Sequence, residues 1–196
     1  LSDRGGGRVQ RDCRMSEPLP PGLPAALPSP RPAAFLDRDG TLVNDPGFQR
    51  DPSKVELLPG AAAAVARLNA ADIMVIVVTN QSGIARGLIT PAEYAAVERA
   101  ITARFADANA RLDATYHCPH YPAVGGPCEC RKPGTLLYRR AAEDWGLDLR
   151  ACWGVGDRVS DLEPVLALGG RGVLVRTGAG RKHESEAREA GFPVVD

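Results

Sequence analysis

The chain is organised around the segment Phe35-Leu36-Asp37-Arg38-Asp39-Gly40-Thr41-Leu42-Val43. The apolar run over residues 33–36 predicts a buried strand, and it ends on two carboxylates that are separated by one residue. Gly40 then permits a sharp turn because it has no Cβ. Two carboxylates this close repel each other unless a cation lies between them, so the spacing indicates a hard, oxygen-preferring ion such as Mg²⁺. An exposed acidic turn is the alternative. A calcium loop is excluded, since Leu42 stands where that loop requires glycine.

The composition is that of an ordinary globular protein. The chain has 196 residues, of which 44% are hydrophobic and 24% charged, and this length is enough for one domain. The 24 basic and 24 acidic residues cancel, so neither a nucleic-acid partner nor an anionic membrane surface is predicted. No apolar run approaches the roughly 20 residues of a membrane-spanning helix. The sequence leaves the oligomeric state open, a monomer included.

The first 32 residues differ in composition from the rest. They are rich in glycine, arginine and proline, and cannot bury enough apolar surface to offset the entropy cost of ordering. We therefore expect a disordered tail over residues 1–32 and a folded domain over residues 33–196. Prolines interrupt any apolar core of an export signal in the tail, and the odd number of cysteines, 5, fits a reducing compartment. A cytoplasmic location is the resulting prediction.

The folded region alternates short apolar runs with helical patterns. Thr90 and Glu93 form a capping box, and the helix that begins there carries an apolar face that we expect to extend to Ala108 and Leu112. Alternation of this kind predicts an α/β fold with a doubly wound parallel sheet, whose ligands bind at the carboxyl ends of the strands. The predicted strands cover residues 33–36, 73–78, 115–118, 152–155 and 173–175, and the predicted helices cover 59–69, 91–112, 135–145, 160–168 and 181–190.

Polar side chains follow three of these strands. Asp37 and Asp39 follow the first, the segment Thr79-Asn80-Gln81-Ser82 follows the second, and Asp157 follows the fourth. Carboxylates can hold Mg²⁺, and the cations of Arg131 and Lys132 suit a phosphoryl group. Asp37 is then the natural nucleophile, and Asp39 can exchange a proton with the leaving alcohol and the attacking water. A non-catalytic phospho-binding module is the alternative, although Asp39 favours rapid hydrolysis of an aspartyl-phosphate.

From about Ala33 to its last residue, the chain resembles the haloacid-dehalogenase superfamily of phosphatases. The resemblance implies a Rossmann-like fold with no separate cap domain, Mg²⁺ dependence, and an aspartyl-phosphate intermediate. It also implies that Asp37 is the nucleophile, Asp39 the general acid and base, and Thr79 and Lys132 contacts of the phosphoryl group. The implied Mg²⁺ ligands are Asp37, the backbone carbonyl of Asp39, and Asp157. The matching residues are Asp37-Arg38-Asp39-Gly40-Thr41, Thr79, Lys132, and Gly156-Asp157 with Asp161.

A second constellation combines Cys118-Pro119-His120 with Cys128-Glu129-Cys130. Three thiols and one imidazole fit a tetrahedral structural Zn²⁺ site, which would stabilise the loop that presents Arg131 and Lys132. A disulfide and a chance cluster are the alternatives, and the reducing compartment disfavours the disulfide. We expect His117 to be an ordinary histidine at a strand end, and Cys152 to be a buried small hydrophobe.

Within the superfamily this zinc loop is typical of two groups, which act on D-glycero-D-manno-heptose 1,7-bisphosphate and on histidinol phosphate. Thr79 to Gly87 resembles the heptose group, whereas the short zinc loop is closer to the histidinol group. The heptose substrate is the prediction, with histidinol phosphate as the alternative. The resemblance implies that the substrate contacts are Asp45, Pro46, Gly47, Phe48, Asn80, Gln81, Ser82, Arg131 and Arg158, besides the catalytic residues.

Overall fold

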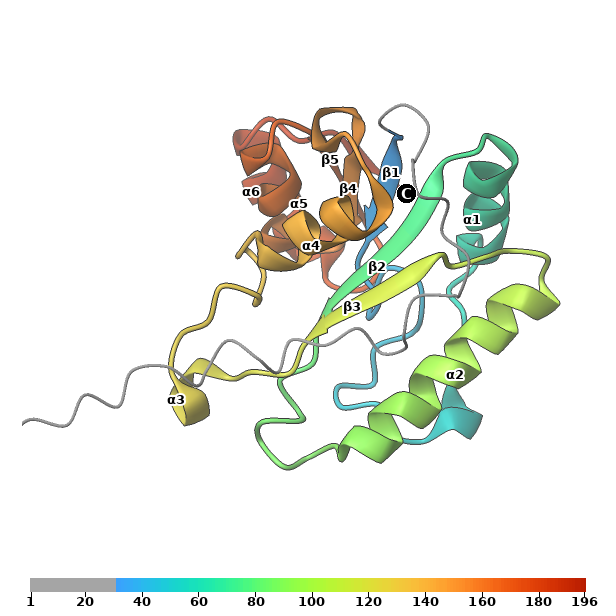
Figure 1. Cartoon of the computed structure of the whole chain (residues 1–196), viewed down its shortest axis with the longest axis vertical. Helices are drawn as coiled ribbons and strands as arrows, with labels where there is room; N and C mark the ends of the chain where they lie inside the picture. Colours follow the sequence, from blue (N-terminus) through green and yellow to red (C-terminus); the bar gives the residue numbers. More distant parts are fainter. Residues whose placement is uncertain (1–30) are drawn as a thin grey trace, which may run out of the picture.

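Two strands that are buried on both faces form the centre of the structure. They are β1 (Ala33–Leu36) and β2 (Met74–Asn80), and nearly all of their side chains are excluded from solvent, as a sheet covered by helices on both sides requires. The computed structural model describes residues 31–196 (Figure 1). All of the predicted tail except its last two residues therefore lies outside the described residues.

The sheet has six parallel strands in the order β3-β2-β1-β4-β5-β6. This is the doubly wound order, in which the chain first builds outward from β1 on one side and then returns to build from β4 on the other. The prediction of a doubly wound parallel sheet is confirmed. The outer strands are β3 (Ala114–Cys118), β4 (Trp153–Gly156), β5 (Arg171–Val175) and β6 (Val194–Val195). The sequence did not predict β6, because two residues are too few to show a periodic pattern.

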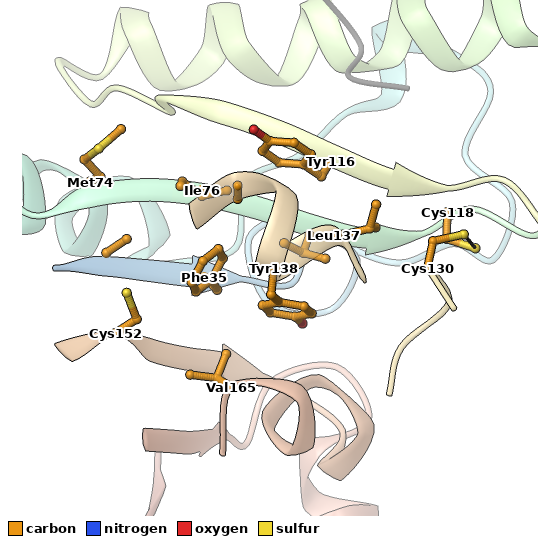
Figure 2. Close-up of a cluster of buried hydrophobic side chains, with 13 residues drawn as sticks. Phe35, Met74, Ile76, Tyr116, Cys118, Cys130, Leu137, Tyr138, Cys152 and Val165 are labelled. Atoms are coloured by element: carbon orange, nitrogen blue, oxygen red, sulfur yellow. Dashed lines mark hydrogen bonds between the residues drawn. The ribbon is translucent and has the colours of Figure 1, made fainter. Parts of the chain in front are cut away.

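Helices cover both faces of the sheet. On one face α1 (Ala61–Ala70) and α2 (Pro91–Asp107) pack against Leu36, Val75 and Val77. On the other, α4 (Leu136–Trp145) and α5 (Val159–Ala167) pack against Phe35, whose ring centroid lies 5.0 Å from that of Tyr138. Figure 2 shows these two rings at the centre of this second cluster, with Cys118 and Cys130 together at its end. The remaining elements are α6 (Gly180–Glu189), which packs beside α5, and the short turns η1 (Pro52–Lys54), α3 (Pro122–Gly125) and η2 (Leu149–Ala151).

Helix α2 begins as predicted but ends earlier. The side chain of Thr90 accepts a hydrogen bond from the backbone N–H of Glu93, and the Glu93 carboxylate accepts one in return, which completes the capping box. The helix stops at Asp107, because Asn109 adopts a φ of 56° in the left-handed region that asparagine tolerates. The predicted extension of the apolar face to Ala108 and Leu112 is therefore wrong. Ala108 is exposed and Leu112 lies beyond the helix.

The connections at the carboxyl edge of the sheet contain little regular secondary structure. The segment between β1 and α1 contains only η1, and the segment between β3 and α4 contains only α3. Residues 31–196 thus have no separate cap domain, as predicted. In the same range, no helix is both long and apolar enough to cross a membrane.

Candidate active site

Polar side chains converge where β1, β2 and β4 end. These strands are neighbours in the sheet, with β1 between β2 and β4. Asp37, Thr79 and Asp157 therefore meet at the topological switch point, where the strand order reverses. A pocket of about 350 Å³ opens here, which is large enough for a sugar phosphate. It is lined by Asp37, Asp39, Asp45, Gly47, Phe48, Thr79, Asn80, Gln81, Ser82, Gly83, Arg131, Lys132, Arg158, Ser160 and Asp161.

The turn after β1 requires its glycine. Gly40 has a φ of 87°, and a Cβ at this position would collide with the side chain of Asp157. The backbone N–H of Gly40 donates to the carbonyl of Val43 at 2.8 Å, and the N–H of Leu42 donates to the carbonyl of Arg38 at 2.9 Å. The absence of a side chain therefore lets the first and fourth strand ends approach each other closely.

Lys132 is the cation at the floor of the pocket. Its Nζ atom lies 2.5 Å from Asp37 Oδ1, 2.8 Å from Asp161 Oδ1 and 2.8 Å from the carbonyl oxygen of Val78. Three N–H donors thus meet three acceptors, and only 2% of the side chain is exposed. The two carboxylates hold the pKa of Lys132 above its ordinary value despite the opposing effect of burial, so the ammonium stays charged.

Three buried carboxylates surround this lysine. Oxygen atoms of Asp37, Asp157 and Asp161 all lie within 4.8 Å of one another, and burial raises the pKa of Asp37 to about 8. Burial also raises the pKa of Asp157. Asp157 Oδ2 accepts a hydrogen bond from the backbone N–H of Ala179 at 2.7 Å, while its buried Oδ1 has no hydrogen-bond partner among residues 31–196. One lysine does not balance three carboxylates, so the group fits a divalent cation.

Asp161 was matched by motif but was not among the predicted metal ligands. It lies four residues after Asp157, so the first turn of α5 brings its carboxylate back toward the strand end. Its oxygens are already engaged, one with Lys132 and the other with the backbone N–H of Arg158 at 3.0 Å. Asp37 and Asp157 are consequently the two carboxylates best placed for direct coordination. The side chain of Asp39 lies outside the group of carboxylates, and its backbone carbonyl as a ligand stays a prediction.

The amides after β2 are used inside the protein. Asn80 donates to the carbonyl of Lys132 at 3.3 Å and accepts from its backbone N–H at 3.0 Å, which anchors the lysine. Gln81 Nε2 donates to Thr79 Oγ1 at 2.8 Å and to Asp39 Oδ2 at 2.7 Å. Both residues line the pocket, as does Ser82, but the contacts of the two amides indicate that they also position their neighbours.

One wall of the pocket comes from the loop after β1. Asp45 accepts a hydrogen bond from the backbone N–H of Gly47 at 2.8 Å, which shapes the turn, and Phe48 follows on the rim. Pro46 faces the adjacent hollow of the same loop rather than the pocket itself. The guanidinium of Arg86 lies 4.9 Å from the Phe48 ring centroid and 5.1 Å from that of Tyr121. We call these three side chains the arginine stack. It joins the wall to the cysteine-rich loop.

Two arginines supply the positive charge of the pocket besides Lys132. Arg158 is half exposed, and its Nε atom lies 3.9 Å from Asp157 Oδ1. Arg131 precedes Lys132, and its Nη1 atom is buried without a hydrogen-bond partner in the described part of the chain. A buried guanidinium nitrogen without an acceptor is costly, so this atom is ready to bind an anion.

The cysteines and one histidine of the predicted zinc loop do come together. Cys118, Cys128 and Cys130 have Sγ–Sγ distances of 3.2, 3.5 and 3.7 Å, and His120 Nδ1 lies 3.1 and 3.8 Å from two of them. Ligand bonds near 2.3 Å in a tetrahedron place the ligand atoms about 3.7 Å apart, so the spacing fits Zn²⁺. All three cysteines are free thiols, which contradicts the disulfide alternative.

His117 and Cys152 behave as expected. His117 stacks on Tyr94 with ring centroids 4.3 Å apart, outside the zinc group, and burial together with the nearby Arg38 lowers its pKa to about 4. Cys152 is fully buried, in agreement with the prediction of a small core hydrophobe.

Comparison with known proteins identifies relatives of this chain. A family model described as HAD-hydrolase-like matches residues 129–196. The D-glycero-beta-D-manno-heptose-1,7-bisphosphate 7-phosphatase of Yersinia pestis is 36% identical over 162 residues, which are 80% of this chain and 86% of the relative. The enzyme of the same name from Escherichia coli K12 is 37% identical over 161 residues, which are 79% of this chain and 84% of the relative.

Solved structures agree with the sequence relatives. A D,D-heptose 1,7-bisphosphate phosphatase from B. bronchiseptica, crystallised with magnesium and phosphate, superposes with a TM-score of 0.77 at 37% identity and covers 85% of this chain and 92% of that one. A putative HAD-like phosphatase from Mesorhizobium loti gives a TM-score of 0.72 at 36% identity, over 76% of this chain and 74% of that one.

Proposed function

The chain belongs to the haloacid-dehalogenase family of phosphatases, and from that membership we propose that it removes the C7 phosphate of D-glycero-D-manno-heptose 1,7-bisphosphate. The observation that carries the choice of substrate is the pair of arginines, Arg131 and Arg158, in the same pocket as the Asp37–Lys132 pair. A bisphosphate has one phosphate for the floor of the pocket and a second for the arginines.

We assign the nucleophile to Asp37. Lys132 occupies its Oδ1, which fixes the plane of the carboxylate and steadies its charge. A carboxylate oxygen attacks the phosphorus, the bond to the leaving oxygen breaks, and an aspartyl-phosphate forms. Thr79 donates to a phosphoryl oxygen, and the ammonium of Lys132, whose own N–H groups bind Asp37, Asp161 and the carbonyl of Val78, offsets the negative charge that accumulates during transfer. Asp39 gives a proton to the leaving alcohol and later takes one from the attacking water.

The carboxylates of Asp37 and Asp157 are the proposed side-chain ligands of Mg²⁺. The orphaned Oδ1 of Asp157 and the raised pKa of Asp37 both support this assignment, because each is relieved by a bound cation. When bound, Mg²⁺ supplies positive charge against the phosphoryl oxygens. Asp161 would orient Lys132 in this arrangement rather than coordinate directly.

We assign Zn²⁺ to the cluster of Cys118, His120, Cys128 and Cys130 in a structural role. Four protein ligands leave no open position for substrate. Cys130 directly precedes Arg131 and Lys132, so ordering of this loop sets the position of both cations. Zinc is therefore expected to support activity without taking part in the chemistry.

The substrate assignment is tested by phosphate release in the presence of Mg²⁺, with kcat/KM measured for heptose 1,7-bisphosphate and for histidinol phosphate. Histidinol carries an ammonium group that two arginines would repel, so we expect a preference of about 100-fold, or about 2.7 kcal/mol, for the heptose substrate. Equal rates or the reverse preference would overturn the assignment.

A matched pair of variants sharpens this test. Arg158→Met should lower kcat/KM for the bisphosphate about 10-fold or more, because the bisphosphate loses a charge-assisted hydrogen bond. It should raise kcat/KM for histidinol phosphate, because the ammonium of that substrate is then repelled by one arginine fewer. Arg171→Met is the control. Arg171 is the exposed first residue of β5, at the amino ends of the strands and away from the pocket. This change should therefore alter kcat/KM for neither substrate.

A further inference from the structure

Arg38 is a buried cation that the proposed mechanism does not use. It lies between Asp37 and Asp39 in the sequence, yet only 1% of the residue is exposed, so its charge must be balanced within the protein. It is: Nε donates to Asp39 Oδ1 at 3.0 Å, Nη2 donates to Asp39 Oδ2 at 2.8 Å, and Nη1 donates to Glu98 Oε1 at 2.5 Å. Each guanidinium nitrogen therefore contacts a carboxylate oxygen.

The partners of Arg38 come from two different parts of the fold. Asp39 belongs to the turn after β1, whereas Glu98 lies on the buried side of α2, 60 residues further along the chain. The ring of Tyr94, one helical turn before Glu98, faces the guanidinium at 5.7 Å. One side of the Arg38 guanidinium thus contacts helix α2, and its Nε and Nη2 atoms donate to Asp39 on the other side.

The two oxygens of Asp39 are not equivalent in this arrangement. Oδ2 accepts hydrogen bonds from both Arg38 and Gln81, whereas Oδ1 accepts one from Arg38 alone. A carboxylate oxygen has two lone pairs, so the donors found here fill Oδ2 and leave one position open on Oδ1. The Asp39 side chain is 19% exposed and lines the pocket, so this position can be reached by substrate.

We propose that Arg38, held by Glu98, is a positioning residue that fixes the Asp39 carboxylate so that Oδ1 is the atom that exchanges the proton. This inference rests on the proposed phosphatase function. In the first step the bond from Asp37 to phosphorus forms, the ester P–O bond breaks, and the proton on Asp39 Oδ1 passes to the leaving oxygen. In the second step water attacks phosphorus, its proton passes to Oδ1, and the bond to Asp37 breaks.

A purely structural ion pair would have a different signature. If Arg38 only stabilised the fold, its loss would lower the rate for every substrate to the same extent. A role through Asp39 depends on the leaving group, because an alkoxide must be protonated as it leaves and p-nitrophenolate need not be. Since kcat/KM reports the steps up to formation of the aspartyl-phosphate, it separates the two interpretations.

The test compares Arg38→Lys and Glu98→Gln with the wild type on heptose 1,7-bisphosphate and on p-nitrophenyl phosphate. Lysine keeps the charge but lacks the planar fork. We expect Arg38→Lys to lower kcat/KM about 100-fold for the sugar ester and by no more than about fivefold for the aryl ester. Glu98→Gln should act in the same direction by about 10-fold, because Arg38 loses its charged anchor.

Two controls separate this effect from a loss of stability. Glu93 caps the same helix and does not contact Arg38. Glu93→Gln should therefore lower the melting temperature slightly and leave kcat/KM unchanged for both the sugar ester and the aryl ester. On an Asp39→Asn background, Arg38→Lys should cause no further loss for the sugar ester, because the residue it positions no longer exchanges the proton.

Equal losses on the two esters, or additive losses on the Asp39→Asn background, would overturn the inference. If Arg38→Lys fails to fold, Glu98→Gln serves as the test, by the same comparison of the loss in kcat/KM for the sugar ester with the loss for the aryl ester. A wild type that hydrolyses another sugar phosphate better than the heptose bisphosphate would count against the proposed substrate alone. The loss in kcat/KM for the better sugar phosphate would then be compared with the loss for p-nitrophenyl phosphate, and this comparison would test the role of Arg38 as before.

Discussion

Among the described residues, Lys132 is the lysine that lines the pocket, and replacing it with methionine nearly conserves its volume while removing its charge. Its ammonium makes ion pairs with Asp37 at 2.5 Å and with Asp161 at 2.8 Å, and both carboxylates are at most 10% exposed. Removing one partner of a buried ion pair leaves an uncompensated charge and costs about 3–5 kcal/mol. We expect a loss of this size in the free energy of unfolding when Mg²⁺ is omitted.

The loss in the free energy of unfolding of Lys132→Met should depend on the other charges of the site. Mg²⁺ at about 100 times its dissociation constant contributes about 2.7 kcal/mol to any form that binds it. A variant with one cation fewer should bind Mg²⁺ more tightly and gain more than the wild type, so its deficit in the free energy of unfolding should shrink when Mg²⁺ is added. The double variant Lys132→Met/Asp161→Asn should also recover part of the loss, because one of the unpaired carboxylates is then neutral.

Urea denaturation followed by circular dichroism measures these differences. Magnesium should be omitted rather than chelated, so that the cysteine-histidine cluster is left undisturbed. Lys54→Met is the matched control, because its side chain is 76% exposed and the change should cost less than about 0.5 kcal/mol. A deficit for Lys132→Met no larger than that of the control, or one that Asp161→Asn leaves unchanged, would refute the assignment of Lys132 as the counter-ion of the buried carboxylates.

Three other predictions concern the metals and the pocket wall. Cys128→Ser should reduce bound zinc from one ion per chain and lower the melting temperature, whereas Cys152→Ala should leave the zinc content, measured by mass spectrometry, unchanged. Arg86→Ala breaks the arginine stack and should raise KM for the sugar phosphate about fivefold with kcat nearly constant, since each cation–π contact contributes about 0.5–2 kcal/mol; a fall in kcat alone would contradict this role for the wall. Burial raises the pKa of Asp37 from 3.8 to about 8, so the Mg²⁺-free protein binds more protons than its unfolded chain across this range and loses stability as pH rises through it. Added Mg²⁺ should therefore raise the melting temperature more at pH 8 than at pH 5.5, and a gain independent of pH would contradict this reasoning.

Local pattern was sufficient for the order of the elements. The apolar run before Asp37 and the longer one before Thr79 each predicted a strand, and both strands are found, buried on both faces. The capping box at Thr90 predicted the start of α2. These signals succeed because burial and capping depend on neighbours within a few residues along the chain. The end of α2 was missed because a single asparagine in the left-handed region, Asn109, outweighed a continuing apolar pattern.

What the sequence by itself determined is which chemistry is present: two carboxylates after β1, a lysine behind a cysteine pair, and four ligands with zinc spacing. Only the tertiary structure decided which of these groups are paired. Lys132 meets Asp37 across 95 residues, and Arg38 meets Glu98 across 60. Asn80 holds the backbone of Lys132 instead of facing substrate alone, and Asp161 joins the carboxylates beside Asp37. The reason is physical: the local pattern specifies strands and helices, but partners this distant in sequence meet only through the order in which the strands join the sheet.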